Sequence, residues 1–306
     1  MDVLAEANRL AAQGKPVLSL AVGQPAAPVP EPVRRAGADA IVAGRLGYTD
    51  TLGRRETRMA IAAHYRDHYG VDVPMERIAV TTGSSAGFSL AFLALADPGA
   101  RVAIASPGYP AYRNILKALS LQPVELPSDN GGFDIDALMA AHRERPVAML
   151  LLASPANPTG TVIEREALGA IVEACRDAGI AFISDEIYHR LRYTGNDVTA
   201  LAFGDDVIVI NSFSKYYCMT GWRIGWMVLP EPLVRPVERL AQSLYICAPD
   251  VSQIAAPHAF ACTDEYEAIK DGYRANRALL MERLPQMGMQ FAARPDGAFY
   301  VWCDVS

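Results

Sequence analysis

Several residue types that commonly mark function are scarce or scattered in this 306-residue sequence. The five cysteines form no C-x-x-C pair, which favours reduced thiols in the cytoplasm over a disulfide framework or a zinc site. Basic residues do not outnumber acidic ones, and the formal charge of −6 disfavours nucleic acid as a partner. Apolar runs are short, as in VAMLLLA (147–153), whereas a membrane-spanning helix needs about 20 residues. The opening MDVLAEANRL also lacks the basic start and apolar core of a secretory signal.

Lysine is rare as well, so chemistry that needs a lysine amine has four candidates: Lys15, Lys117, Lys215 and Lys270. The hydrophobic share of 51% is enough for a packed core and excludes a disordered chain. The length suits one large domain or two of ordinary size.

Short apolar runs alternate with helical patterns through most of the chain. Such runs, apolar at nearly every position, are typical of strands covered on both faces, and they occur at residues 101–105, 147–152, 180–184 and 207–211. Between two of them, residues 165–178 carry apolar side chains at helical spacing, and Gly179 ends that helix. This alternation predicts an α/β fold with a mainly parallel sheet and helices on both sides.

Polar or aromatic residues follow four of the expected strands. Tyr109 comes after the first, Asn157 after the second, Asp185 after the third and Lys215 after the fourth. Because ligands bind beyond the carboxyl ends of parallel strands, we expect these four residues to line one site.

The pattern changes toward both ends of the chain. Residues 1–17 are expected to hold an N-terminal helix (3–12) that packs with a small domain, and residues 18–262 a large domain. Residues 263–306 are interpreted as the start of a small C-terminal domain, with a helix at 274–284 and a strand at 298–303, AFYVWC.

Three short patterns leave alternatives open. Residues 212–215 match the nucleophile motif S-x-x-K, but the chain has no accompanying K-T-G. His64 and His68 have metal-ligand spacing without a third ligand, so we expect two half-exposed surface histidines and no metal site. The small residues at 83–87, before a helix expected to begin near Phe88, suit either a phosphate-binding turn or a simple helix cap.

Four longer segments, taken in order, resemble one family. They are SPGYP (106–110), ANPTG (156–160), SDEIY (184–188) and NSFSKYYCMTGWRIGW (211–226), each following an expected strand. Together they resemble the class I/II aminotransferases, the fold-type-I enzymes that use pyridoxal 5'-phosphate. The resemblance implies an α/β fold with a three-layer large domain around a mainly parallel sheet, and an incomplete small α/β domain.

The resemblance also implies roles around the cofactor ring. Lys215 resembles the lysine that binds the cofactor covalently, and Asp185 the carboxylate that keeps its ring nitrogen protonated. Asn157 and Tyr188 resemble the pair that hydrogen-bonds the phenolic oxygen, and Tyr109 the aromatic residue stacked on the ring. The catalytic residues implied are Lys215, Asp185 and Tyr188.

Further positions match the phosphate and substrate ends of the family's site. Ser84, Ser85, Ala86, Ser212, Ser214 and Arg223 resemble phosphate ligands, since a guanidinium grips a phosphate in fork geometry. Tyr48 resembles the tyrosine that reaches the phosphate of the partner subunit, which implies a homodimer. Gly23 and Asn157 resemble residues that contact the substrate.

The implied reaction moves an amino group between an amino acid and a 2-oxo acid. Two alternatives remain: another fold-type-I reaction, such as that of a lyase, synthase or decarboxylase, and a cofactor-binding but inactive fragment or regulator. The family's arginine that binds the substrate α-carboxylate lies beyond the strand expected at 298–303. The resemblance therefore implies truncation at the C-terminus and slightly at the N-terminus, with feeble transamination unless another arginine, such as Arg294, takes that role.

Overall fold

The computed structural model describes residues 2–20, 22–128 and 132–305. One large β-sheet forms the centre of the fold. In this part of the chain the sheet has seven strands in the order β1-β7-β6-β5-β4-β2-β3. Its strands are β1 (Ile78–Thr81), β2 (Arg101–Ser106), β3 (Gln122–Pro127), β4 (Val147–Ala153), β5 (Ala181–Asp185), β6 (Ile208–Ser212) and β7 (Gly225–Val228). Only β7 runs antiparallel to its neighbours β1 and β6, and the other pairs are parallel. The prediction of a mainly parallel sheet is confirmed.

Helices occupy most of the remaining described chain. The α-helices are α1 (Asp2–Ala12), α2 (Glu31–Ala43), α3 (Arg55–His64), α4 (Ser84–Leu95), α5 (Pro110–Ala118), α6 (Ile135–Glu144), α7 (Arg165–Ala178), α8 (Glu231–Leu244), α9 (Asp250–Ala255) and α10 (Thr263–Gln286). Shorter turns of other helix types are η1 (Tyr65–Tyr69), η2 (Met75–Arg77), η3 (Ala200–Phe203), η4 (Thr220–Trp222) and η5 (Ala256–Ala261). None of the helices described is long and apolar enough to cross a membrane.

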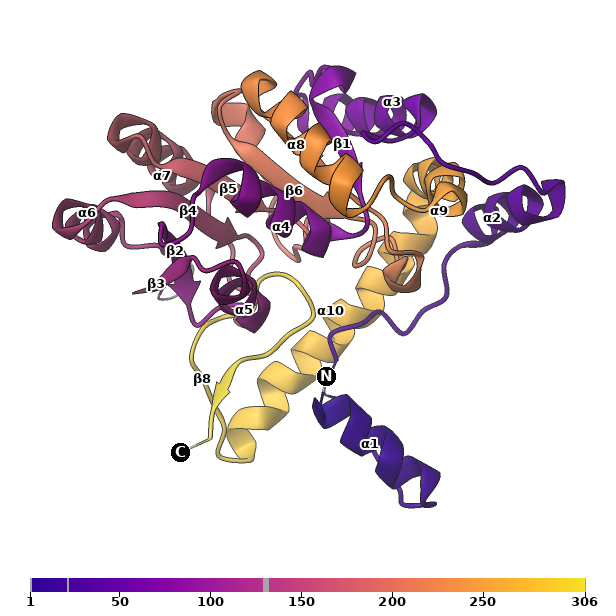
Figure 1. Cartoon of the computed structure of the whole chain (residues 1–306). Coiled ribbons are helices and arrows are strands. Elements are labelled where there is room, and N and C mark those ends of the chain that lie inside the picture. The colour runs from indigo at the N-terminus through magenta and orange to yellow at the C-terminus, as the bar shows by residue number, and fades with distance from the viewer. Residues whose placement is uncertain (1, 21, 129–131, 306) are drawn as a thin grey trace.

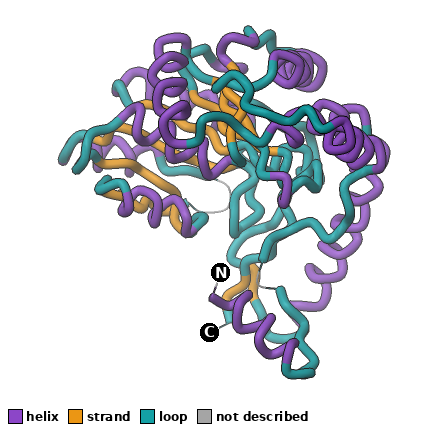
Figure 2. Tube along the Cα trace, turned by 45° about the vertical axis from the view of Figure 1, so that its right-hand side comes forward, coloured by secondary structure: helices purple, strands orange, loops and turns teal. Residues whose placement is uncertain are grey.

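The sheet separates two apolar layers, which gives the three-layer architecture (Figures 1 and 2). Along β6, Ile208 and Ile210 face one layer and Val209 the other, because successive strand residues point to opposite faces. The first layer packs against α4, α5 and α8, and the second against α6 and α7, among other elements. Both faces are thus covered, as the continuously apolar strands require.

Helix α7 illustrates how the sequence sets an element. It spans the residues predicted, and the apolar side chains that the periodicity singles out are buried. Gly179 follows in the left-handed conformation, with φ of 67°, and its N–H binds the last carbonyl groups of the helix. By contrast, α4 begins at Ser84 rather than near Phe88, so residues 84–87 belong to its first turn.

The C-terminal part departs from the expected pattern. Of the predicted strand AFYVWC, only Cys303 lies in a strand, β9 (Cys303–Asp304), which pairs with β8 (Gln290–Phe291). The prediction is wrong for residues 298–302. Ala298 has φ of 57°, which interrupts an extended strand, and its carbonyl oxygen accepts a hydrogen bond from the Tyr193 hydroxyl. Side-chain and loop contacts therefore replace a strand ladder there.

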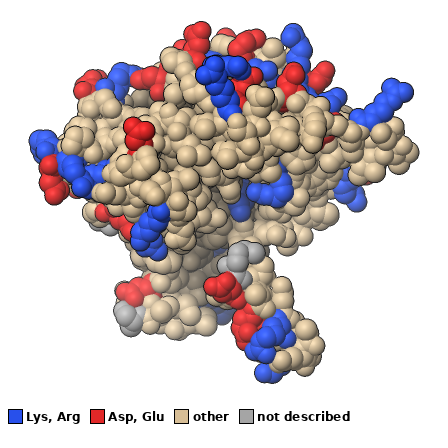
Figure 3. All heavy atoms as spheres, in the orientation of Figure 1, with Lys and Arg blue, Asp and Glu red and all other residues tan. Residues whose placement is uncertain are grey.

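The ends of the chain lie away from the sheet. Helix α1 buries none of its residues and extends from the body in both views, while the long α10 runs down toward β8 (Figures 1 and 2). The proposed division at residues 17 and 262, and the packing of residues 1–17 with a small domain, stay predictions. On the face in Figure 3, basic and acidic side chains are interspersed along the upper part, and a largely uncharged band crosses the middle.

The histidine pair differs from expectation in one member. His68 is exposed, but His64 is buried and its ring stacks on Phe260 at a centroid distance of 4.8 Å. The expectation of two half-exposed surface histidines is therefore wrong for His64, which is part of an aromatic cluster. Helical spacing alone does not reveal which face of a helix is covered by a distant segment.

Candidate active site

A cavity of about 480 Å³ opens beyond the carboxyl ends of the parallel strands. The four residues expected after strands all line it: Tyr109, Asn157, Asp185 and Lys215. Further predicted site residues that line it are Gly23, Ser84, Ser85, Tyr188, Ser214 and Arg223. The parallel topology thus gathers residues that are far apart in the sequence.

Lys215 reaches the cavity from the turn after β6. Its Nζ donates a hydrogen bond to the Gly23 carbonyl oxygen at 2.7 Å and lies 5.6 Å from the centre of the Tyr188 ring. Burial lowers the pKa of this amine to about 8, against an opposing effect of the Asp185 carboxylate. The neutral amine, which is the nucleophilic form, is therefore far more populated near neutral pH than that of an ordinary lysine.

Asp185 ends β5 and is almost fully buried. Its Oδ2 accepts a hydrogen bond from the Tyr112 hydroxyl, and its Oδ1 accepts one from the Ile187 backbone N–H at 3.0 Å. Burial raises the pKa of the carboxyl to about 6, and these two hydrogen bonds limit the rise. A buried carboxylate with few compensating donors is suited to pairing with a protonated ring nitrogen of a bound molecule.

Two tyrosines meet on the side of the cavity nearest the N-terminal segment. The hydroxyl oxygens of Tyr188 and Tyr300 are 2.6 Å apart. A Cβ atom on Gly23 would lie 1.8 Å from the Tyr300 hydroxyl, so only glycine permits this close approach. Segments near both ends of the chain thereby form this wall.

The opposite end of the cavity combines a helix N-terminus with a guanidinium. Gly83, which precedes α4, has φ of 73° and ψ of 169°, a conformation almost restricted to glycine. A Cβ atom there would lie 2.3 Å from Nη2 of Arg223, so the guanidinium lies directly against this turn. Backbone N–H groups at the start of α4 and the charge of Arg223 together suit an anionic group such as a phosphate.

Three of the predicted residues do not line this cavity. Ser212 is buried, and its hydroxyl lies 3.0 Å from the Ile224 carbonyl oxygen and 2.8 Å from Oγ of Ser214. Ala86 is buried in the first turn of α4. Tyr48 is 84% exposed and borders a different, shallow cavity near residues 244–250.

The structure adds residues that the sequence reasoning missed. Tyr112 lies three positions after Tyr109, in the first turns of α5, and this i, i+3 spacing could have marked it as a neighbour of the site. Tyr300 lay within the stretch interpreted as a strand. Phe88, Ile187 and Thr220 complete much of the remaining lining.

Comparison with known proteins gives this site its context. The family described as aminotransferase class I and II matches residues 15–306. The chain belongs to this family. The valine–pyruvate aminotransferase of Mycobacterium tuberculosis is 48% identical over 314 residues, covering 100% of this chain and 80% of the relative. The aminotransferase is therefore an enzyme that moves amino groups between amino acids and 2-oxo acids, in a family that uses pyridoxal phosphate.

Solved structures agree with the aminotransferase fold. The crystal structure of an aminotransferase from Mycobacterium tuberculosis has a TM-score of 0.95 at 45% identity, covering 100% of this chain and 80% of that one. The aspartate aminotransferase of Thermus thermophilus with maleate has a TM-score of 0.94 at 30% identity, covering 99% and 81% respectively. The fold is thus shared at two quite different levels of sequence identity.

Proposed function

We propose that this aminotransferase holds pyridoxal phosphate in the cavity between Asp185 and Arg223, bound covalently to Lys215. The observation that carries the proposal is the presence of three chemically distinct groups in one cavity: an anion-binding turn, an amine of lowered pKa and a buried carboxylate. These groups suit the phosphate, the aldehyde and the ring nitrogen of the cofactor respectively. When bound, the cofactor supplies an electron sink for negative charge that develops at the α-carbon of an amino acid.

The other residues are assigned by the family resemblance. Asn157 and Tyr188 would hydrogen-bond the phenolic oxygen of the cofactor, and Tyr109 would contact its ring. Ser84, Ser85, Ala86, Ser212 and Ser214 would hold the phosphate, directly or through a neighbouring residue. The position of Ser212 supports an indirect role, because its hydroxyl orients Ser214 rather than facing the cavity.

Lys215 would have a second role with an amino acid bound in the cavity. Its neutral amine would act as the general base that takes up the proton from the α-carbon of the amino acid. A pKa of about 8 supports this role, since an efficient base has a pKa near the working pH. The Gly23 carbonyl oxygen, 2.7 Å from Nζ, orients the amine on the substrate side of the site.

Borohydride reduction followed by peptide mapping tests the assignment of Lys215. The cofactor-loaded enzyme should yield one modified peptide, carrying Lys215. Lys215→Ala should yield none, whereas Lys117→Ala, in which an exposed lysine of α5 is removed, should yield the same peptide as the native chain. Modification of Lys117 or Lys270 with Lys215 intact would refute the proposal.

For the substrate, we propose an amino donor with an uncharged side chain and a small 2-oxo acid acceptor. Val22, Tyr109 and Tyr300, which line the cavity, are apolar or aromatic, and the arginine among the lining residues, Arg223, is assigned to the phosphate. A relative at 48% identity is named for valine and pyruvate. A panel of valine, aspartate and arginine as donors with pyruvate as acceptor, scored by release of the 2-oxo acid of each donor, tests this. Preference for aspartate or arginine would overturn it.

We further propose that the active form is a homodimer in which Tyr48 contacts the phosphate of the partner subunit. Its 84% exposure supports the assignment, because its hydroxyl is available to a second chain. Neighbouring apolar side chains, Ile41 and Val42 of α2, are also exposed. Tyr48→Phe should weaken cofactor binding by about 1 kcal/mol, the scale of one hydrogen bond. Light scattering that finds a monomer in the cofactor-loaded enzyme would contradict the dimer.

We assign the enzyme to the cytoplasm on the state of its thiols. All five cysteines are free, and three of them are buried. Unpaired buried cysteines are typical of proteins kept in a reducing compartment. Fractionation of cells that express the native chain tests this assignment.

A further inference from the structure

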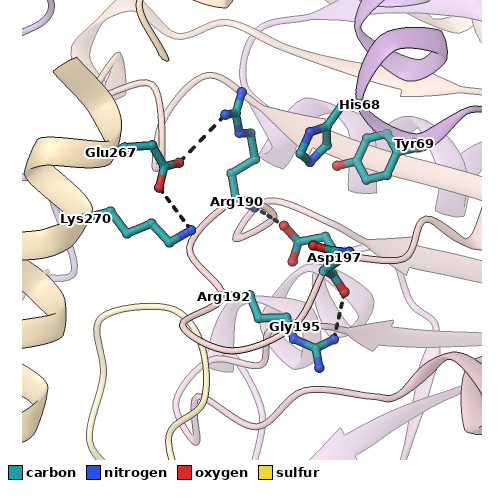
Figure 4. Close-up of a pocket in the computed structure, with 9 residues that line it drawn as sticks. His68, Tyr69, Arg190, Arg192, Gly195, Asp197, Glu267 and Lys270 are labelled. Carbon is teal, nitrogen blue, oxygen red and sulfur yellow. Dashed lines mark hydrogen bonds and ion pairs between the residues drawn. The ribbon is translucent and has the colours of Figure 1, made fainter. Parts of the chain in front are cut away.

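A second cavity, of about 410 Å³, shares no lining residue with the candidate active site. Figure 4 shows the side chains that line it. It is bounded by His68 next to α3, by the loop at residues 190–197 that follows β5, and by Glu267 and Lys270 on α10. Its lining is dominated by charged side chains, in contrast to the mixed lining of the active-site cavity. None of its residues has a role in the aminotransferase chemistry proposed above.

The arginine and lysine side chains that line this cavity differ in how closely they approach a carboxylate. Arg192 is committed to the carboxylate of Glu164, at 2.7 and 2.9 Å. Arg190 and Lys270 instead share Glu267, at 3.7 and 3.4 Å, although only 14% and 13% of these two side chains is exposed. A charge-assisted hydrogen bond is normally about 2.8 Å long. Two largely buried cations thus face the cavity with one distant carboxylate between them.

Neighbouring residues restrict both the backbone and the guanidinium group of Arg190. Its backbone has φ of 69°, an unfavourable value for arginine, and its N–H donates to Oδ2 of Asp197. Its guanidinium lies 4.4 Å from the centre of the Tyr216 ring, which fixes the plane of the fork. A fork with a fixed plane binds carboxylate or phosphate oxygens with little further loss of entropy.

The charges that line the cavity act on His68, which is exposed as a residue but whose ring is partly desolvated. The pKa of this imidazole is lowered first by the desolvation and next by the charge of Arg190; Asp197 opposes the lowering, and His189 and Lys270 add to it. His68 therefore reports the charge of the cavity, and a bound anion would raise its pKa.

We propose that this cavity is a second ligand site, which binds a small organic anion through its carboxylate or phosphate group on Arg190 and Lys270. The volume is within the range of ligand pockets and exceeds the need of a bare ion. The ring of Tyr69 provides an uncharged wall for the organic part of the ligand.

The second site is connected to Lys215 through one hydrogen bond and one peptide bond. Glu267 accepts a hydrogen bond from the Tyr216 hydroxyl at 2.7 Å, and Tyr216 directly follows Lys215. An anion that draws Arg190 and Lys270 away from Glu267 changes the partners of Tyr216. The site is thus placed to influence the loop that carries Lys215.

Titration of the histidines by NMR tests the proposal in the full cofactor-loaded chain, in which the anion-binding turn at α4 is filled. The probes are inorganic phosphate and succinate, and the His68 signal is assigned with His68→Gln. Either probe should give a saturable shift at millimolar concentration and raise the pKa of His68 by about one unit. Tighter binding of phosphate identifies a phosphorylated ligand, and tighter binding of succinate a carboxylic acid.

Matched variants separate a site from a general salt effect. Lys270→Gln should weaken the probe at least about tenfold, and Arg190→Lys, which keeps the charge but loses the fork, should also weaken it. Lys117→Gln removes the same charge from an exposed position on α5 and should leave the affinity unchanged. The proposal is overturned if the shift does not saturate, if chloride at equal ionic strength reproduces it, or if both lysine variants behave alike.

Discussion

Replacing Asp185 by asparagine should make the cofactor-free aminotransferase more stable at neutral pH while abolishing most of its activity. The carboxyl is almost fully buried, and burial raises its pKa from an ordinary value of 3.8 to about 6. A group whose pKa is higher in the folded state destabilises the fold once it ionises. This penalty is absent below about pH 4 and complete above about pH 6.

The size of the effect follows from the same pKa values. A rise of about two units corresponds to about 3 kcal/mol, at 1.36 kcal/mol per unit. Asparagine has the same shape and no charge, and the Tyr112 hydroxyl, now facing an amide, can still form a hydrogen bond. The variant should therefore gain up to about 3 kcal/mol in the free energy of unfolding at pH 8 and nothing at pH 4.

Urea unfolding of the cofactor-free native and variant chains between pH 4 and pH 8 measures this difference. Asp39→Asn serves as the control, because it removes one negative charge from an exposed position on α2. Amino transfer by the loaded Asp185→Asn chain should fall severely, since an amide cannot hold the ring nitrogen protonated. Equal stability of native and variant chains at pH 8, or a variant that is less stable there, would refute the burial argument.

Three further predictions concern other parts of the cavity. Loading of pyridoxal phosphate onto Lys215 should accelerate with rising pH and level off above about pH 8, because the neutral amine reacts; stopped-flow absorbance that levels off only above about pH 10 would contradict the lowered pKa. Gly83→Ala should weaken cofactor affinity at least about tenfold by displacing the neighbouring guanidinium, as measured by equilibrium titration, whereas Gly14→Ala, at a similar φ of 75° in open space, should not. Tyr300→Phe and Tyr188→Phe should show a coupling of about 1 kcal/mol in a double-mutant cycle of unfolding, and additivity would exclude the hydrogen bond between them.

The sequence predicts the centre of the fold well because burial on both faces leaves a simple signal. The strands that end at Asp185 and shortly before Lys215 are apolar at nearly every position, and parallel strands end at the same edge of the sheet. The apolar pattern of the strands was therefore enough to predict that Asp185 and Lys215 line one site. Their roles rest on resemblance and on the geometry described here.

What the sequence could not predict depends on contacts between distant segments. The apolar stretch at 298–302 has the composition of a strand, but hydrogen bonds from residues such as Tyr193 and the left-handed Ala298 hold it in an irregular form. The burial of His64 depends on Phe260, which lies almost two hundred residues away in the sequence. Propensity and spacing describe a segment on its own, whereas the irregular form of residues 298–302 and the burial of His64 are decided by contacts with distant residues.

The wall formed by Gly23 and Tyr300 joins residues from near the two ends of the described chain. Lys215, from the turn after β6, donates to the Gly23 carbonyl oxygen, and Tyr188, from the segment after β5, meets Tyr300. Both Gly23 and Tyr300 lie outside the central sheet, in loops that can open locally without unfolding the sheet. A molecule bound in the cavity therefore stabilises the docked form of both loops by mass action, and their resistance to proteases becomes a measure of how fully the cavity is occupied.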